Sequence, residues 1–504
     1  MNLWVIAPVL LPLLAGILLL LLPQSRLTLH RALSVMAVAA QLGLMLALMA
    51  AVSDGRILIY ALGNWPAPFG IVLVADRLTA WMLVITALLA LFALLYALRG
   101  DDRAGRYFHV LFQLQLFGLN GAFLTGDLFN LFVFFEILLL ASYGLLLHGG
   151  GRRRIRAGLH FVVVNLAGST LFLFAVGTLY GVLGTLNMAD LAIKVAAAPP
   201  ENVPLVRAAG LLLFGVFALK AALLPFYLWL PAAYAHTSAS AAALFAIMTK
   251  VGAYSILRVY TLIFGPEAGP AANLLECWLL PLALATLMVG MIGTVASTHL
   301  RQQAAYLVVA SVGSLLIAFG LNTPAGIAAG LYYLPHTTFA AAALFLLADL
   351  IARQRGIMSD RLDSGPDLPN SRLLGALFFI TAIAVTGLPP LSGFLGKFLT
   401  LRAALDHPLL PWVMGAILVA ALLGLIALAR TGSLLFYRVD PETAPATPWP
   451  TIWVEIAPVI GLLLLLLGLT VGAGPAFDQS RAITDQMLQP QLYIQAVMNP
   501  GGAP

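Results

Sequence analysis

The sequence has too few charged residues and too few cysteines for most classes of soluble protein. Charged residues make up 9% of the 504 residues, whereas hydrophobic residues make up 62% and the mean hydropathy is +1.00. Soluble domains carry about 25% charged residues, so this composition indicates a polytopic membrane protein. The single cysteine, Cys277, excludes a disulfide framework and any multi-cysteine iron–sulfur or zinc site within this chain.

Motifs for cofactors and for enzymatic chemistry are also lacking. The eight histidines are scattered without the close spacing of metal ligands, and there is no phosphate-binding loop or nucleophile constellation. We therefore predict no metal, no cofactor and no conventional catalysis in this chain. Residues 1–23 are apolar but lack a basic leader and a small-residue cleavage motif, so we interpret them as a transmembrane helix and not a signal peptide.

Apolar runs long enough to cross a bilayer are abundant. Runs of about 20 residues predict an all-α fold. The fourteen predicted transmembrane helices are 3–23, 31–52, 76–98, 107–126, 128–148, 158–183, 207–230, 237–264, 274–297, 303–321, 325–352, 373–405, 411–435 and 452–472. The predicted divisions are three N-terminal helices (1–106), two five-helix repeats (107–264 and 274–437), and a last helix with a tail (438–504). The tail is rich in Gly, Pro and Gln, and we expect a surface segment.

The arginines predict how these helices are oriented. Sixteen basic residues follow odd-numbered helices, as in "RRRIR" at 152–156, and seven lie at the opposite face. Loops rich in lysine and arginine face the cytoplasm. Both termini are therefore expected outside the cytoplasm, in a multi-pass protein of the bacterial inner (cell) membrane.

Three of the four lysines lie inside predicted helices. Lys220, Lys250 and Lys397 occupy apolar segments, whereas Lys194 lies in a loop. A charged side chain near the bilayer centre is costly and usually has a function. Arginine keeps its proton, but a desolvated lysine can titrate near neutral pH. This distribution favours proton exchange at the lysines over a fixed charge.

Two other ionisable side chains are comparably deep. Glu136 lies in the middle of the predicted helix 128–148, and His336 lies in 325–352. A glutamate and a lysine that lie close together titrate as a coupled pair, so moving one partner changes the proton affinity of the other. The alternative is a static ion pair that fixes helix packing. Five such groups on five helices favour a path for protons.

Prolines interrupt two of these helices beside the lysines. Pro225 has no N–H to donate, so the seventh helix can break near Lys220. In "LPPLSGFLGK", Pro389 and Pro390 precede Lys397 in the twelfth helix. Interrupted helices at corresponding places in two halves are typical of transporters built from inverted repeats. The pair predicts two inverted repeats, helices 4–8 and 9–13, with helices 7 and 12 broken; for either proline alone, the alternative is a packing kink.

Other polar side chains give weaker predictions. His236 is either a proton relay to the cytoplasm or an ordinary loop residue. His299 and Arg301 are expected to orient and pack a helix junction. Asp349 has Arg353 one turn onward, which predicts an ion pair at the end of a helix.

Three stretches together point to a family. They are "GDLFNLFVFFEILLLASYGLL", "LWLPAAYAHTSASAAALFAIMTKVGAYSILR" and "TGLPPLSGFLGKF". They resemble the antiporter-like membrane subunits shared by respiratory complex I and the multisubunit Mrp (Pha) cation/proton antiporters, and they look most like the D-type Mrp subunits. The resemblance covers all fourteen helices. It implies that Glu136 and Lys220 are the proton-handling pair, Lys250 the relay lysine, Lys397 the terminal lysine, and His336 the family histidine.

The resemblance implies a subunit of a hetero-oligomeric antiporter that exports Na⁺ or K⁺ at the expense of the proton gradient. The alternatives are a proton-pumping membrane subunit of a complex I-like NADH/quinone oxidoreductase and a scaffold that does not transport. Two positions depart from many relatives. Ala232 stands where they have aspartate, and Ala341 stands where they have lysine, so we expect fewer titratable links in the second half.

Overall fold

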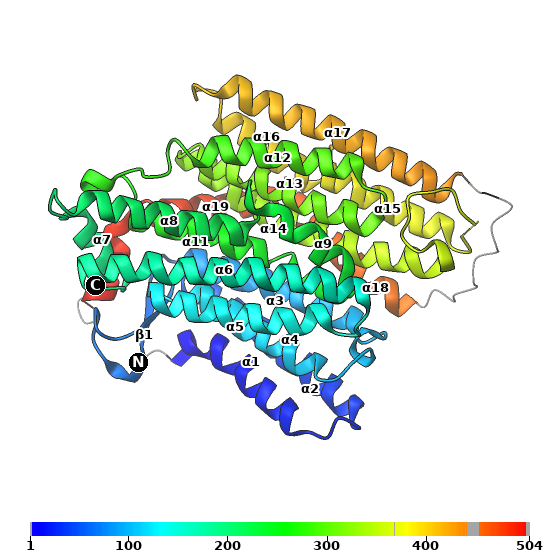
Figure 1. The fold of residues 1–504 in the computed structure, drawn as a ribbon, viewed down its shortest axis with the longest axis horizontal. Coiled ribbons are helices and arrows are strands. Elements are labelled where there is room, and N and C mark those ends of the chain that lie inside the picture. Colours follow the sequence, from blue (N-terminus) through cyan, green and yellow to red (C-terminus); the bar gives the residue numbers. More distant parts are fainter. Residues whose placement is uncertain (1–2, 367, 439, 441–452, 500–504) are drawn as a thin grey trace.

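A computed structural model of the protein describes residues 3–366, 368–438, 440 and 453–499. Within them, twelve spans are long and apolar enough to cross a membrane. Two shorter apolar helices, Phe108–Leu124 and Ser371–Thr386, bring the number to the predicted fourteen. The helices form one elongated bundle, and both marked chain ends lie at the same end of it (Figure 1).

The helix bounds agree with the predicted ones to within several residues at most ends. The first half contains α1 (Leu3–Leu21), α2 (Leu27–Ala51), α3 (Arg77–Ala97), α4 (Phe108–Leu124), α5 (Leu128–Leu147), α6 (Arg152–Leu183), α8 (Val203–Ala221), α9 (Trp229–His236), α10 (Ala239–Phe245) and α11 (Met248–Leu262). The second half contains α12 (Leu279–Ala296), α13 (Leu300–Gly320), α14 (Pro324–Gln354), α15 (Ser371–Thr386), α16 (Ser392–Ala403), α17 (Leu410–Phe436) and α18 (Trp453–Val471).

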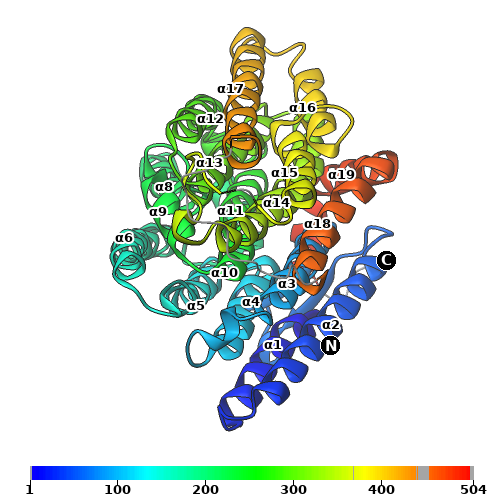
Figure 2. The ribbon, with the colours of Figure 1, turned by 90° about the vertical axis from the view of Figure 1, so that its right-hand side faces the viewer.

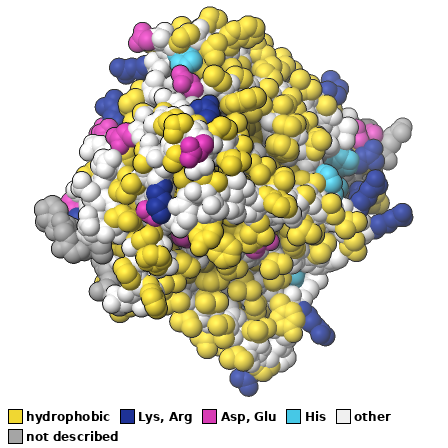
Figure 3. Space-filling model, turned by 60° about the vertical axis from the view of Figure 1, so that its left-hand side comes forward, with side chains coloured by type: hydrophobic (Ala, Val, Ile, Leu, Met, Phe, Trp, Pro, Cys, Tyr) yellow, Lys and Arg dark blue, Asp and Glu magenta, His cyan; other side chains and the backbone are white. Residues whose placement is uncertain are grey.

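The two completely enclosed segments are less apolar than several helices at the outside of the bundle. α17 is more apolar than α14, yet 33% of its most apolar stretch is buried, against 100% for α14 and for the segment that joins α10 and α11. Figure 2 shows α10, α11 and α14 surrounded by other helices. In Figure 3, hydrophobic side chains cover much of one face, and most charged side chains lie near its margins. Such a surface suits lipid, and it leaves the polar side chains to the interior.

Both predicted interruptions are present. α8 ends at Ala221 and α9 begins at Trp229, with a 3₁₀ turn, η3 (Phe226–Leu228), between them. α15 ends at Thr386 and α16 begins at Ser392. The interruption predicted for each half is therefore present, in a helix that bears a lysine. Their inverted symmetry stays a prediction.

A third interruption corrects the sequence-based expectation. The single helix predicted over 237–264 is divided, because α10 ends at Phe245 and α11 begins at Met248. Between them, the amides of Ala246 and Ile247 donate to carbonyls three residues earlier, at 3.2 and 3.3 Å. This tighter turn needs neither proline nor glycine, so no helix-breaking residue in the sequence indicates it.

The tail is also more ordered than expected. It forms α19 (Ala473–Met487) and α20 (Pro490–Met498), and α19 buries Ser480 and Ile483 completely. The side chain of Gln486 accepts from the amide of Arg77 at 3.1 Å and donates to the carbonyl of Gly55 at 2.8 Å. The predicted surface segment is therefore a pair of docked helices. Two further unpredicted features are a hairpin of β1 (Leu58–Ala61) and β2 (Val72–Ala75) and the short helix α7 (Met188–Ala196).

One of the seven basic residues that the sequence places at the face opposite the arginine-rich loops is instead buried. Arg258 lies in α11 with 6% of its surface exposed, and its Nη2 is 2.6 Å from a carboxylate oxygen of Asp76 at the start of α3. Its guanidinium also lies 5.3 Å from the ring centre of Tyr493 in α20. Because a desolvated charge needs such partners, this pair joins α3, α11 and the tail.

The Asp76–Arg258 pair should contribute strongly to stability. Asp76→Ala leaves Arg258 buried without its carboxylate, and breaking a buried pair from one side costs about 3–5 kcal/mol. Asp54→Ala is the matched control, since Asp54 lies 2.6 Å from Arg56 in an exposed pair. We expect Asp76→Ala to lower the Tm of the detergent-purified protein and Asp54→Ala to leave it unchanged. Equal melting temperatures would contradict the structural role of the buried pair.

Candidate functional site

Lys220 lies where the interrupted seventh helix ends. It is the next-to-last residue of α8, it is 5% exposed, and its Nζ lies 3.3 Å from Oδ1 of Asn165 in α6. The residue that follows the helix, Ala222, adopts the left-handed conformation with φ of 59°. The indole of Trp229 in α9 donates to the carbonyl of Leu219 at 3.0 Å. Side chains from beyond the break thus satisfy the helix end beside the lysine.

Glu136 and Lys220 are connected through α6 and do not meet directly. Glu136 lies in the middle of α5, is partly buried, and accepts a hydrogen bond from Oγ of Ser169 in α6. The same hydroxyl lies 3.1 Å from the carbonyl oxygen of Asn165. No ion pair joins Glu136 to Lys220 in the part of the chain that the structure describes.

Asn165 and Ser169 were not among the predicted site residues. Their only signal in the sequence is a pair of polar side chains four residues apart in an apolar helix, in "NLAGS". Residues at this spacing share one helix face, but polar residues in transmembrane helices commonly serve helix packing. The pattern alone therefore does not distinguish a site from a contact.

Lys250 is enclosed more completely than the other lysines. It lies near the start of α11, it is fully buried, and its Nζ has no hydrogen-bond partner among the described residues. The hydroxyls of Thr249 and Thr337 are likewise buried and unpaired. Buried polar groups are almost always hydrogen bonded, to protein or to ordered water. Each of these buried groups is therefore suited to a hydrogen bond with internal water.

His336 and Lys397 meet at the second interruption. Nδ1 of His336 in α14 lies 2.9 Å from Oγ of Ser392, the first residue of α16. A Cβ on Gly393 would lie 2.7 Å from Nε2 of His336, so the imidazole packs on bare backbone. Nζ of Lys397 donates to the carbonyl of Thr386 at 2.7 Å. This carbonyl ends α15, and an ammonium is favourable at a helix C-terminus.

A cavity joins the ionisable groups of the second half. Its polar lining consists of Ser311, Ser314, Tyr333, His336, Thr337 and Lys397. Ala341 lines the same cavity. The structure therefore brings His336 and Lys397 together, and it places the alanine that replaces a lysine of many relatives beside them.

A charged cluster lies at the arginine-rich end of the bundle. The predicted Asp349–Arg353 pair is confirmed at 2.7 Å, and Asp349 also lies 2.5 Å from Arg301 and accepts from the hydroxyl of Tyr96 at 2.7 Å. Arg353 lies 3.7 Å from Asp101. Arg301 therefore belongs to an ion-pair network between α3, α13 and α14, which agrees with its expected packing role.

Two adjacent carboxyls near this end respond to their surroundings in opposite ways. Burial raises the pKa of Asp101, and the nearby Asp349 carboxylate raises it further. Burial would also raise the pKa of Asp102, but hydrogen bonds from His109 and Arg31 hold that pKa at about 2. Asp101 is thus the carboxyl of this pair that takes up a proton more readily. The carboxylate of Asp102 serves as a fixed partner of the Arg31 guanidinium, at 2.6 Å.

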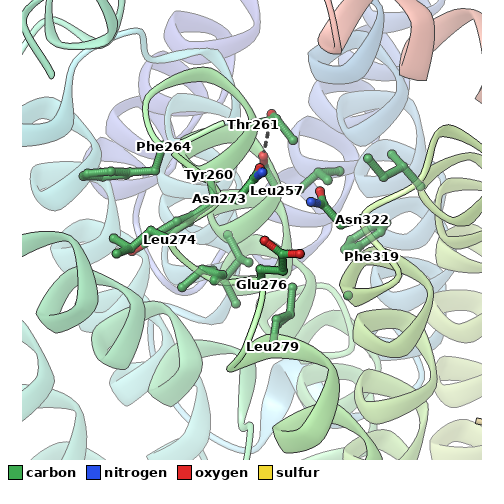
Figure 4. A pocket seen from close by; sticks show the side chains of 14 residues that line it. Leu257, Tyr260, Thr261, Phe264, Asn273, Leu274, Glu276, Leu279, Phe319 and Asn322 are labelled. Atoms are coloured by element: carbon green, nitrogen blue, oxygen red, sulfur yellow. Dashed lines mark hydrogen bonds between the residues drawn. The ribbon is translucent and has the colours of Figure 1, made fainter. Parts of the chain in front are cut away.

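A second pocket lies near the other end of α11, between the two halves. Figure 4 shows the polar ends of Asn273, Glu276 and Asn322 turned toward this pocket, beside Tyr260 and Thr261. The rest of its lining is mostly apolar. Tyr260 follows Lys250 by ten residues, which corresponds to about 15 Å along a helix axis. The pocket is therefore separate from Lys250.

Comparisons with known proteins cover the whole chain. Residues 125–424 match the family described as NADH:quinone oxidoreductase/Mrp antiporter, TM. A probable D-type subunit of a K(+)/H(+) antiporter from Rhizobium meliloti (strain 1021) is 42% identical over 469 residues, covering 88% of this chain and 86% of the relative. The D-type subunit of a Na(+)/H(+) antiporter from Alkalihalophilus pseudofirmus is 37% identical, covering 99% of this chain and 100% of the relative.

Solved structures share the same fold over the same length. A chain in the Mrp complex from Dietzia sp. DQ12-45-1b matches with a TM-score of 0.88 at 30% identity, covering 99% of this chain and 100% of that chain. A chain of respiratory complex I from Thermus thermophilus matches with a TM-score of 0.78 at 27% identity, covering 96% and 99%.

The close approach of α11 to the end of α8 should be sensitive to one added methyl group. A Cβ on Gly252 would lie 2.5 Å from the amide nitrogen of Ala221, whereas a Cβ on Gly215 would have no neighbour within 4 Å. Gly252→Ala must displace backbone and should lower the Tm of the purified protein, because overpacking costs about 1–3 kcal/mol. Gly215→Ala should leave the Tm unchanged or raise it slightly. A Tm for Gly252→Ala as high as that of Gly215→Ala would contradict this packing.

Proposed function

Because the chain belongs to the NADH:quinone oxidoreductase/Mrp antiporter transmembrane family, we propose that it is the proton-translocating subunit of a multisubunit Na⁺(K⁺)/H⁺ antiporter. Two relatives that span nearly its whole length are D-type subunits, one of a K(+)/H(+) and one of a Na(+)/H(+) antiporter. The observation that carries the proposal is the set of buried or partly buried lysines at or beside helix interruptions. A buried lysine can exchange its proton, whereas an arginine keeps it.

The proposed path begins at the first interruption. Lys220 gains or loses a proton according to its separation from Glu136, since moving a charged partner alters proton affinity. Lys250 receives the proton from Lys220, and its buried, unpaired Nζ is suited to passing the proton onward through internal water. His336 and Lys397 then continue the path in the cavity of the second half.

The proposed setting is a bacterial cell membrane, with the arginine-rich loops in the cytoplasm and both termini outside. The chain works there with other subunits of a hetero-oligomeric complex, as the match to a chain of an Mrp complex supports. The exported ion is Na⁺ or K⁺. The charged cluster of Asp101, Asp349 and Arg353 would then face the cytoplasm.

A second candidate function is proton pumping within a complex I-like NADH/quinone oxidoreductase. The match to a chain of respiratory complex I favours it. Redox chemistry would then come from partner subunits. Ion flux and redox activity separate the two candidates: antiport requires cation-dependent proton movement in vesicles without NADH or quinone, whereas the pump requires electron transfer in the purified assembly.

Neutralising either member of the proton-handling pair should abolish antiport. Lys220→Ala and Glu136→Ala are measured as Na⁺- or K⁺-dependent collapse of a pH gradient in inverted vesicles that carry the whole complex. Lys220→Arg should be inactive too, because arginine retains the charge but does not release its proton. Lys194→Ala, which removes a partly exposed lysine paired with Asp190 at 3.0 Å, should remain active.

Assembly of each variant is checked by the amount of complex recovered from the membrane. Full antiport activity of Lys220→Ala or of Glu136→Ala would contradict the proposed mechanism. An active Lys220→Arg variant would show that a fixed positive charge at this position is sufficient. That result would favour a structural role for Lys220 over proton exchange.

A further inference from the structure

Two buried polar side chains of α6 contact both members of the proton-handling pair. Asn165 is fully buried and Ser169 is 5% exposed, and they lie one turn apart on the helix. Between them, Gly168 packs close to α8, where a Cβ would lie 3.2 Å from Leu219. One face of α6 therefore connects the Glu136 carboxylate on α5 with the Lys220 ammonium on α8.

The hydrogen bonds of Asn165 give its amide a fixed direction. Its Nδ2 donates to the carbonyl of Phe161 at 2.9 Å, which leaves Oδ1 to accept from Nζ of Lys220 at 3.3 Å. An amide oxygen stabilises an ammonium without carrying charge. In a medium of low dielectric, a carboxylate would attract the same ammonium far more strongly. Asn165 is thus an acceptor for the lysine that competes with Glu136.

Ser169 has one proton and two acceptors within reach. Its Oγ donates to Glu136, and the carbonyl oxygen of Asn165 lies 3.1 Å away. A hydroxyl donates one hydrogen bond at a time. When Glu136 is a carboxylate it accepts that proton. When Glu136 is protonated it becomes a donor, and the serine hydroxyl can turn to the Asn165 carbonyl. The serine therefore responds to the protonation of Glu136.

From this geometry we propose that Asn165 and Ser169 are positioning residues for proton exchange. Asn165 accepts a hydrogen bond from the Lys220 ammonium and holds it apart from Glu136. Ser169 donates to the Glu136 carboxylate and holds it apart from Lys220. The ammonium and the carboxylate can therefore either stay separated or form a direct ion pair. This inference rests on the proposed function, because it assigns a role to the same pair.

Two aromatic side chains of α5 also lie near the pair. Tyr143 is the other titratable side chain that the charge of Glu136 influences, and Phe135 borders Lys220 with its ring centre 5.9 Å from Nζ.

Substitutions at Asn165 test the competing acceptor. Asn165→Asp is isosteric and places a carboxylate against the ammonium, which should hold the proton on Lys220 and lower the antiport rate. A hydrogen bond to a charged group is worth about 1.5–3 kcal/mol, which corresponds to roughly a 10- to 100-fold loss. Asn165→Leu removes the neutral acceptor, so Lys220 pairs with Glu136 and antiport should need a more alkaline pH. Asn165→Gln keeps the amide and should retain more activity than Asn165→Leu.

Ser169→Ala supplies a second test that removes a single oxygen atom. Without the hydroxyl, the Glu136 carboxylate is freed toward Lys220, and the pH profile of antiport should move in the same alkaline direction. Thr170→Val is the matched control, since the Thr170 hydroxyl is exposed and bonds only within α6, to the carbonyl of Leu166 at 3.1 Å. It should leave both rate and pH profile unchanged.

All variants are measured in vesicles that carry the complete complex, with Lys220→Ala alongside. Wild-type rates and pH profiles for Asn165→Asp and Ser169→Ala, together with an inactive Lys220→Ala, would overturn this inference and leave the proposed function standing. An active Lys220→Ala would overturn the proposed function itself. If Asn165→Asp fails to assemble, Ser169→Ala decides: an alkaline shift supports the inference, and an unchanged profile contradicts it.

Discussion

The cost of holding an ammonium group away from water governs the arrangement of this bundle. The surroundings differ for each lysine inside the bundle. Lys220 lies against the Asn165 amide, and Lys397 bonds to the last carbonyl of α15. Lys250 is fully buried, and its Nζ has no hydrogen-bond partner among the described residues. Helix interruptions make the first two arrangements possible, because they end a helix inside the bundle and bring its terminus or a neighbouring helix to the lysine.

The two halves stabilise a lysine inside the bundle with different geometry. Lys220 precedes its interruption, whereas Lys397 follows its own and reaches back across it. The first half connects lysine and glutamate through uncharged side chains of α6. The second half instead places a histidine and a lysine around one cavity, where Ala341 adds no charge. The ionisable groups of the proposed proton path therefore differ between the two halves: a lysine and a glutamate in the first, and a histidine and a lysine in the second.

Much of this arrangement could be predicted from the sequence because single residues mark it. Lysines in apolar segments, and prolines beside them, indicated the buried charges and the breaks in the seventh and twelfth helices. The division between α10 and α11 could not be predicted, since a 3₁₀ turn of Ala246 and Ile247 needs no special residue. Nor could the role of Asn165 and Ser169, because polar residues four apart in a membrane helix usually serve packing. The docked tail depends on tertiary contacts such as that of Gln486.

The central claim is that Lys220 changes its protonation state during antiport. The chain has only four lysines, so labelling lysine side-chain nitrogen with ¹⁵N gives few NMR signals, and Lys220→Arg identifies the one from Lys220. We expect this signal to change between charged and neutral forms over the pH range in which antiport runs, and Glu136→Gln to displace the change. A Lys220 signal that stays charged throughout this range would contradict the claim.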